Sequence, residues 1–266
     1  MTTKPTSHLP KSATRPTIDP RKSRILLYGG SGTGRSVFAS QFPATYFDLA
    51  QTATYLEIMR YPVSPPDGWS PSRRGKRATA WQWFLDGIDA CVRDPQTDML
   101  VVDTIDRAFE LCFDAVCMEH SIESPEDNMR RLRQTYGQIN REFGRMLSRL
   151  RLFPGGLVLI CNEEIVCRDQ AGAIVDPSAD NVATRRAEPS FKAKSPARHK
   201  LRGNLEELCG IIGRTVIASD GSRMLCISAR DSLGKDRTGL LPSLLGLDYE
   251  SFCEPFRKAY SAAPSE

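Results

Sequence analysis

The stretch GGSGTGRS, from Gly29 to Ser36, decides which fold we expect for this chain. It fits the phosphate-binding pattern G-x-x-x-x-G-K-[ST] at Gly29, Gly34 and Ser36, but its lysine position holds Arg35. Glycines keep side chains out of the way, so that backbone N–H groups can wrap a phosphate. The alternative is a plain glycine-rich turn between a strand and a helix. The context favours a phosphate loop, because an apolar run precedes the stretch and a helical pattern follows it.

A phosphate loop predicts bound ATP and Mg²⁺. The residues expected at the nucleotide are Gly29, Gly30, Ser31, Gly32, Thr33, Gly34, Arg35, Ser36 and Val37. The Ser36 hydroxyl is a metal ligand in this motif. A second expected metal residue is Asp103, which ends the apolar run LVVD, since an acid at this place holds Mg²⁺ in P-loop proteins. The other interpretation of Asp103 is an N-cap for a helix starting at Ile105.

The rest of the chain alternates between apolar runs and helical patterns. Runs at 24–29, 45–50, 98–106 and 155–164 predict strands, and segments at 35–42, 81–92, 107–120, 128–152 and 248–260 predict helices. This alternation is typical of an α/β fold with a mainly parallel sheet flanked by helices. Later strands, joined by a turn at Asp220 and Gly221, predict antiparallel strands at one edge.

Composition sets the expected boundaries and compartment. We expect a disordered basic arm (1–22), one nucleotide-binding domain (23–260) with a loop insertion (61–80) and a basic loop (163–203), and a tail (261–266). The 266 residues carry a net charge of +4 and no apolar run of the roughly 18–20 residues that span a bilayer. The eight cysteines form no C-x-x-C pair and mostly lie in apolar segments. Together with the absence of a secretory signal, this predicts a reduced protein of the bacterial or phage-infected cytoplasm, without membrane association.

A second glycine-flanked motif is GKDRTG, residues 234–239. On an extended segment, Lys235 and Arg237 point to the same face, as an arginine finger for a γ-phosphate requires. The alternative is a solvated basic loop.

Taken in order, GGSGTGRS, FDLA, VVDT, LVLICNEE and KDRTGLLP resemble the RecA-like P-loop ATPases, in particular the phage nucleotide-binding proteins of that fold, some of which anneal single strands. The resemblance covers residues 24–256. It implies that Lys235 and Arg237 act in trans on the nucleotide of a neighbouring copy, in a ring or filament. It also implies that Asn162, after LVLIC, senses the γ-phosphate.

The departures from this resemblance concern catalysis. FDLA keeps Asp48 but has Ala50 where such proteins carry a glutamate that orients water. Arg35 is bulkier than lysine and spreads its charge over a planar fork. Glu163 or Glu164 is the candidate replacement for the missing base. We therefore expect a site that binds ATP and hydrolyses it weakly or not at all.

The segment from Thr184 to Gly203 suggests single-stranded DNA as a partner. Its basic residues surround one acid and one aromatic, which suits phosphate contacts and base stacking. The residues expected to contact DNA are Arg185, Arg186, Phe191, Lys192, Lys194, Arg198, Lys200 and Arg202. The alternative is a solvated basic linker.

Three functions are compatible with these sequence features. The first is an ATP-binding protein of phage-type recombination or annealing with impaired hydrolysis. The second is an active DNA-dependent ATPase, and the third is a nucleotide-free scaffold that binds a partner protein.

Overall fold

A computed structural model describes residues 19–262 apart from 73–74, 76, 129–131 and 191–197. The strands are β1 (Arg24–Gly29), β2 (Thr45–Asp48), β3 (Met59–Arg60), β4 (Met99–Asp103), β5 (Gly156–Arg168), β6 (Ile174–Val175), β7 (Thr184–Pro189), β8 (Ile211–Ile217), β9 (Arg223–Cys226), β10 (Lys235–Asp236) and β11 (Leu244–Gly246). The helices are α1 (Arg35–Ala39), α2 (Ala80–Arg93), α3 (Ile105–His120), α4 (Leu132–Leu152), α5 (Arg198–Leu208) and α6 (Tyr249–Ala262), with 3₁₀ turns at Pro20–Lys22 and Pro125–Asn128.

The strands form one sheet in the order β11-β9-β8-β1-β5-β4-β2-β3. The neighbours from β8 to β3 are parallel, whereas β9 and β11 continue the sheet antiparallel beyond β8. The α/β fold with a mainly parallel sheet and antiparallel strands at one edge is therefore confirmed. The β8–β9 pair turns at Asp220 and Gly221, as predicted, and Gly221 adopts a positive φ of 83°.

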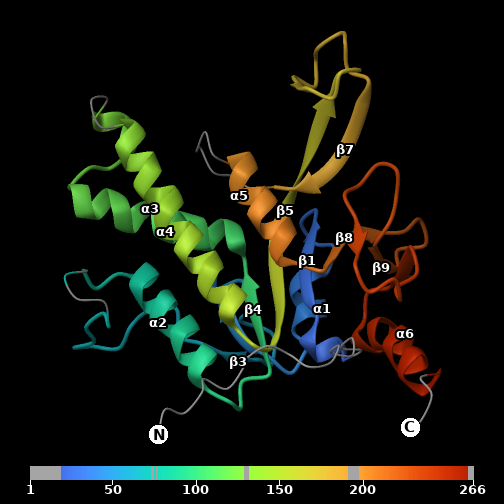
Figure 1. Cartoon of the computed structure of the whole chain (residues 1–266), viewed down its shortest axis with the longest axis horizontal. Helices are drawn as coiled ribbons and strands as arrows, with labels where there is room; N and C mark the ends of the chain where they lie inside the picture. The colour runs from blue at the N-terminus through green and yellow to red at the C-terminus, as the bar shows by residue number, and fades with distance from the viewer. Residues whose placement is uncertain (1–18, 73–74, 76, 129–131, 191–197, 263–266) are drawn as a thin grey trace, which may run out of the picture.

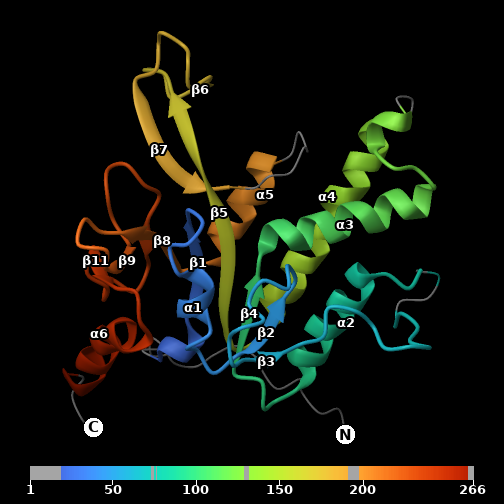
Figure 2. The same ribbon diagram turned by 180° about the vertical axis from the view of Figure 1, so that it is seen from behind.

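Helices cover both faces of the sheet (Figures 1 and 2). Since successive residues of a strand point to opposite faces, β1 supplies both apolar layers. Leu26 and Tyr28 join the core under α2, α3, α4 and α5, while Ile25 and Leu27 join the core under α1 and α6. All eight cysteines are free thiols, and all except Cys226 are buried, which matches their expected role as small apolar side chains. None of the helices in the described ranges is long and apolar enough to cross a bilayer.

The parallel register brings the strand ends together at one edge of the sheet. Gly29 is level with Asn162 of β5 and with Thr215 of β8. Asp48 of β2 is level with Asp103 of β4. The residues that follow these carboxyl ends therefore share one edge, where α/β sheets bind their ligands.

The predicted basic loop at 163–203 is not an open loop, apart from residues 191–197, which lie outside the described residues. β5 runs on past the sheet as far as Arg168, and its outer half pairs with β7 and, at its tip, with β6. Figures 1 and 2 show this hairpin projecting from the body of the molecule. The segment then enters α5, which packs on the core through Leu201 and Leu205. Residues that read as a polar linker in sequence are thus held by strand pairing and by a buried helix face.

Two further boundaries differ from expectation. The helix after the glycine loop ends at Ala39 rather than near Phe42, because Gln41 and Phe42 bond to carbonyls three residues back. Residues 19–22, which were predicted to be part of a disordered arm, are ordered, and the rest of that predicted arm (1–18) lies outside the described residues. Asp19 accepts a hydrogen bond from the Arg21 backbone N–H at 2.9 Å, which closes the 3₁₀ turn there.

Asp248 caps the last helix, α6, and gives a pH-dependent contribution to stability. Its carboxylate accepts hydrogen bonds from the Ser251 backbone N–H at 2.8 Å and from the Ser251 hydroxyl at 2.6 Å. These bonds lower the pKa of Asp248 below its ordinary value. A lowered pKa in the folded state means that the contribution is present at neutral pH and is lost as the pH falls through that pKa.

We therefore expect Asp248→Ala to lower the free energy of unfolding by about 1 kcal/mol at pH 7. The difference from wild type should shrink as the pH falls below about 4, because the carboxylate of the unfolded chain takes up its proton before that of the folded protein. Urea unfolding at several pH values measures this, with the exposed Asp67→Ala as the matched control. A loss of stability that is equal at pH 3 and pH 7 would contradict the capping role.

Candidate functional site

The glycine loop between β1 and α1 needs its glycines for two separate reasons. Gly32 and Gly34 have φ values of 77° and 95°, a region that residues with a Cβ rarely adopt. Gly29 has no room for a side chain, because a Cβ there would stand 2.3 Å from the Thr215 Oγ1. The conformation and the packing of the loop thus both follow from the motif.

A pair of threonines ties the loop to β8. The Thr33 Oγ1 donates to the Gly30 carbonyl at 2.8 Å and lies 2.6 Å from the Thr215 Oγ1. The Thr215 hydroxyl also lies 3.3 Å from the Tyr28 carbonyl, directly before the loop. Because Thr215 is 1 % exposed, these bonds are shielded from water and hold the loop in one shape.

Arg35 connects the loop to β5 on its other side. Its guanidinium donates to the backbone carbonyl of Cys161 and, from both terminal nitrogens, to the Asn162 Oδ1 at 3.2 Å. The Asn162 backbone N–H and side-chain amide in turn donate to the Asp106 Oδ2, at 3.1 and 3.4 Å. The structure therefore brings the two sequence-predicted residues, Arg35 and Asn162, into direct contact, and the cation of the motif is engaged within the protein.

Asp103 lies at the end of β4 and is buried, with 1 % of its surface exposed. Its Oδ2 accepts a hydrogen bond from the Tyr46 hydroxyl at 2.6 Å. Burial raises the pKa of Asp103 above its ordinary value, and hydrogen bonds from Ser36 and Tyr46 oppose that rise. The N-cap interpretation of Asp103 is wrong, because the cap of α3 is Thr104, whose Oγ1 accepts from the Arg107 backbone N–H at 3.3 Å.

Ser36 and Asp103 together fit a magnesium ion. A hydroxyl and a carboxylate are hard oxygen ligands of the kind that Mg²⁺ takes, usually with several waters retained. A buried carboxylate with a raised pKa also gains from a nearby cation, which favours its charged form. The donor set and the electrostatics therefore agree with the metal role expected from sequence.

The acidic residue at the end of β2 has a structural task. Asp48 accepts backbone N–H bonds from Thr52 and Ala53 at 3.1 Å, and the Arg60 Nε lies 3.4 Å from its Oδ2. It therefore shapes the turn after β2. Two residues later, Ala50 is exposed and carries no carboxylate.

Of the two candidate replacement bases, only Glu163 lies at the loop. Its Oε1 is 3.5 Å from the position that a Cβ on Gly30 would take, and its Oε2 accepts from the Arg214 Nε at 2.9 Å. Glu164 instead faces Arg202, 3.5 Å away.

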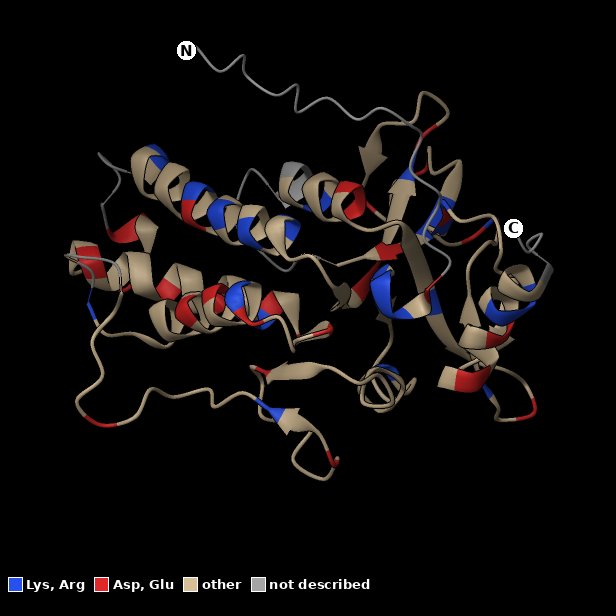
Figure 3. Cartoon of the chain, turned by 60° about the horizontal axis from the view of Figure 1, so that its bottom comes forward, with Lys and Arg blue, Asp and Glu red and all other residues tan. Residues whose placement is uncertain are grey.

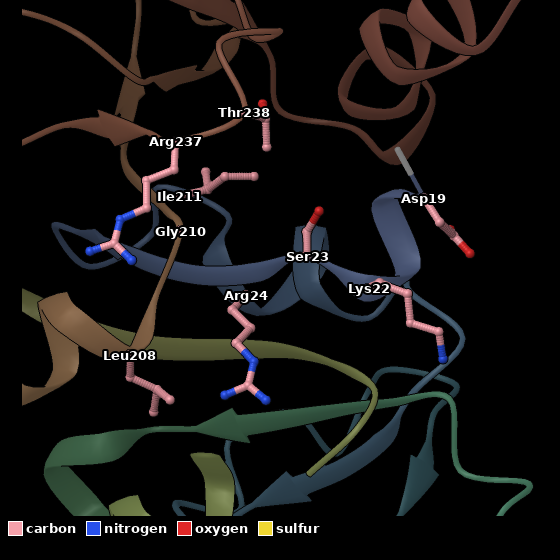
Figure 4. A pocket seen from close by; sticks show the side chains of 9 residues that line it. All are labelled: Asp19, Lys22, Ser23, Arg24, Leu208, Gly210, Ile211, Arg237 and Thr238. Carbon is pink, nitrogen blue, oxygen red and sulfur yellow. The ribbon is translucent and has the colours of Figure 1, made fainter. Parts of the chain in front are cut away.

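Lys235 and Arg237 lie at the opposite edge of the sheet from the loop of their own chain. β10 pairs with the first residues of β8, and the Lys235 Nζ donates to the carbonyls of Glu206 and Cys209, at 2.6 and 2.7 Å. Arg237 lines a pocket of about 280 Å³ together with Arg24, which opens β1 (Figure 4). β1 has six residues, so roughly 20 Å separates this pocket from the loop. Neither cation contacts the nucleotide site of its own chain.

The residues expected at DNA are spread over the hairpin and α5. Arg185 is exposed on β7 and donates to the Pro177 carbonyl at 3.2 Å, and the Arg186 guanidinium donates to the Ser232 carbonyl at 3.0 Å. Arg202 is 12 % exposed and pairs with Glu188 at 2.8 Å, so its charge is neutralised within the protein.

The remaining residues expected at DNA follow β7 in the sequence. Phe191, Lys192 and Lys194 lie outside the described residues, and α5 carries Arg198 and Lys200 in its first turn. Figure 3 shows further basic residues along α4.

Several residues of the site could not be predicted from the sequence. The loop residue Thr33 is bonded to Thr215 of β8. The two acids beside the loop, Asp103 and Glu163, accept hydrogen bonds from Tyr46 and Arg214, and all these partners are distant in sequence. Arg223 of β9 packs directly on Gly34. Nothing in their local sequence marks them, since each is one ordinary position in a short strand. Only the strand order places them at the loop.

Comparison with known proteins gives a family and distant structural neighbours. A family model described as an AAA domain matches residues 21–238. No curated protein matches the sequence. Among solved structures, a KaiC-like protein from the archaeon Pyrococcus horikoshii OT3 is 15% identical, with 78% of each chain covered and a TM-score of 0.34. The flagellar accessory protein FlaH from Methanocaldococcus jannaschii is 12% identical, with 85% of this chain and 84% of that chain covered and a TM-score of 0.36.

The Tyr46 hydroxyl is expected to stabilise the buried Asp103 carboxylate. Tyr46→Phe removes a donor to a buried charged acceptor, which should lower the free energy of unfolding by about 1–3 kcal/mol. Urea unfolding at pH 7, without nucleotide or metal, measures the change. Tyr55→Phe, at a residue 71% exposed, is the matched control and should have no effect. Wild-type stability in Tyr46→Phe would show that the bond to Asp103 is not needed.

Proposed function

The chain belongs to the AAA domain family, and from that premise we propose that it binds ATP with Mg²⁺, hydrolyses it weakly or not at all, and acts on single-stranded DNA in phage-type recombination, annealing or replication. The observation that carries the nucleotide half is the shaped loop from Gly29 to Ser36, with Asp103 beside it. Both lie at the carboxyl edge of a mainly parallel sheet.

The loop is built to receive phosphate oxygens. Its backbone is held in place by Thr33 and Thr215, so little ordering remains to be done on binding. Ser36 and Asp103 would hold the Mg²⁺, and when bound the ion neutralises charge on the β- and γ-phosphates.

We expect weak hydrolysis because the cation of the loop is bonded within the protein and a carboxylate base is missing at position 50. The Arg35 guanidinium is bonded to β5, and its fork does not reproduce the compact ammonium of the usual lysine. Ala50 supplies no base. Losing a general base costs about 10²–10⁴-fold in rate. Losing a charge-stabilising group costs about 10²–10³-fold. Even partial losses of both kinds leave hydrolysis near the uncatalysed rate.

One observation favours the second function, an active ATPase. Glu163 lies beside Gly30, and its pairing with Arg214 holds the carboxylate in a fixed direction. If this acid orients the attacking water, hydrolysis survives without a carboxylate at Ala50.

A phosphate-release assay on the purified protein separates the two functions. We expect wild type to release no more phosphate than Asp103→Ala, with and without single-stranded DNA, because the catalytic groups are missing. Sustained release that both Asp103→Ala and Glu163→Gln abolish would contradict weak hydrolysis and establish Glu163 as the base. Asp67→Ala serves as the control for a substitution far from the loop.

The proposal for DNA rests on the continuity of β5. β5 contains Asn162, which lies next to the loop, and continues into the projecting hairpin, where it pairs with β7. The exposed Arg185 stands on this hairpin, and α5 carries Arg198 and Lys200 in its first turn. In an oligomer, Arg237 would reach a neighbouring copy from the opposite edge of the sheet. We propose this trans role from the resemblance in sequence.

Binding of a fluorescent single-stranded oligonucleotide tests the DNA half. Replacing Arg185, Lys192 and Lys194 together by alanine should weaken binding, because fewer phosphates are then neutralised by the protein. The slope of log K against log salt should become shallower by about 0.7 for each such phosphate. The matched control replaces three exposed arginines of α4, Arg133, Arg141 and Arg151. Equally weak binding by both triple variants would show that binding follows overall charge and not this segment.

A further inference from the structure

Arg223 of β9 packs against the glycine loop from the side opposite to Arg35. A Cβ built on Gly34 would stand 2.7 Å from the Arg223 Cδ and 3.2 Å from its Nε. The stem of the arginine therefore occupies the space that any larger residue at position 34 would need. This contact gives Gly34 a second reason to be glycine, beyond its φ of 95°.

The backbone holds Arg223 in this place. It pairs with Ile217 across the β8–β9 ladder, directly after the turn at Gly221. Its carbonyl accepts a hydrogen bond from the Leu247 N–H at 3.0 Å, and the Leu247 Cδ2 lies 3.2 Å from the same position above Gly34. The main chains of Arg223 and Leu247 are thus linked, and both side chains stand against the loop at Gly34.

The guanidinium of Arg223 differs from the other cations near the loop in having no partner among the described residues. Across the described residues its guanidinium forms no hydrogen bond or ion pair, and the residue is exposed. The two other arginines at the loop differ in this respect, since Arg35 bonds to β5 and Arg214 bonds to Glu163. Exposed arginines are usually just solvated, but this one is seated on the loop whose own cation is turned into the protein.

We infer that Arg223 is a nucleotide-binding residue that supplies, in cis, a cation to the phosphate chain of the nucleotide at the glycine loop. The inference rests on the proposed function, because it assumes that the loop takes a nucleotide. Arg223 then compensates for the engagement of Arg35 with β5. Arginine suits this task, because its planar fork binds phosphate oxygens through paired hydrogen bonds.

Calorimetric titration of wild type, Arg223→Ala and Arg223→Lys with Mg-ATP and with Mg-tripolyphosphate tests this inference. Arg223→Ala should weaken the binding of both ligands by about 10- to 100-fold, as expected when a hydrogen bond between charged groups is removed. Arg223→Lys should keep part of the affinity. Arg141→Ala, at an exposed arginine of α4, should bind like wild type.

The outcomes separate this inference from the function on which it rests. If wild type binds neither ligand, the proposed nucleotide site fails and Arg223 has no ligand to hold. If wild type binds Mg-ATP and Arg223→Ala binds both ligands equally well, the nucleotide site stands and the role of Arg223 is overturned. Weaker binding of Mg-ATP alone also overturns it, because the side chain would then contact the nucleoside and not the phosphates. Thermal unfolding of each variant shows whether weaker binding reflects a damaged fold.

Discussion

The parallel pairing of β1 between β5 and β8 determines where the groups of the site stand. It sets Gly29 level with Asn162 on one side and with Thr215 on the other. Because β5 and β8 both lie alongside β1 where it ends, the loop that follows Gly29 is braced from both sides at once. A one-residue shift in either register would turn these side chains to the opposite face. The loop would then be deprived of its hydroxyl bond to Thr215 and of its link through Arg35 to Asn162.

The site keeps charges in places where they cost stability. Asp103 is buried with a raised pKa, and its main support is a tyrosine hydroxyl and a serine. Buried polar groups of this kind are unfavourable unless each is satisfied, and they are common at functional sites. The same region uses Arg35 to connect the loop to β5, which continues into the hairpin. A single strand therefore joins the phosphate loop to the element that we assign to DNA.

The sequence predicted the main parts of this arrangement because they are local. The glycine pattern, the apolar run that ends at Asp103 and the Asp220–Gly221 turn each depend on neighbouring residues, and each is found where expected. The structure of 163–203 was predicted wrongly, because strand pairing between β5 and β7 joins residues about twenty positions apart and overrides their polar composition. The contacts of Thr215, Tyr46 and Arg223 depend on strand order alone, so no local sequence pattern predicts them. The sequence predicted that Arg202 contacts DNA. Its ion pair with Glu188 also depends on the fold, so charge in the sequence alone did not indicate it.

Crystals of the protein grown with Mg²⁺ and ATP over several days test the nucleotide site most directly. We predict an intact triphosphate on the loop from Gly29 to Ser36, with Mg²⁺ at Ser36 and Asp103. ADP on the loop would contradict the claim that hydrolysis is weak or absent. A loop without nucleotide at millimolar ATP would contradict the nucleotide site itself.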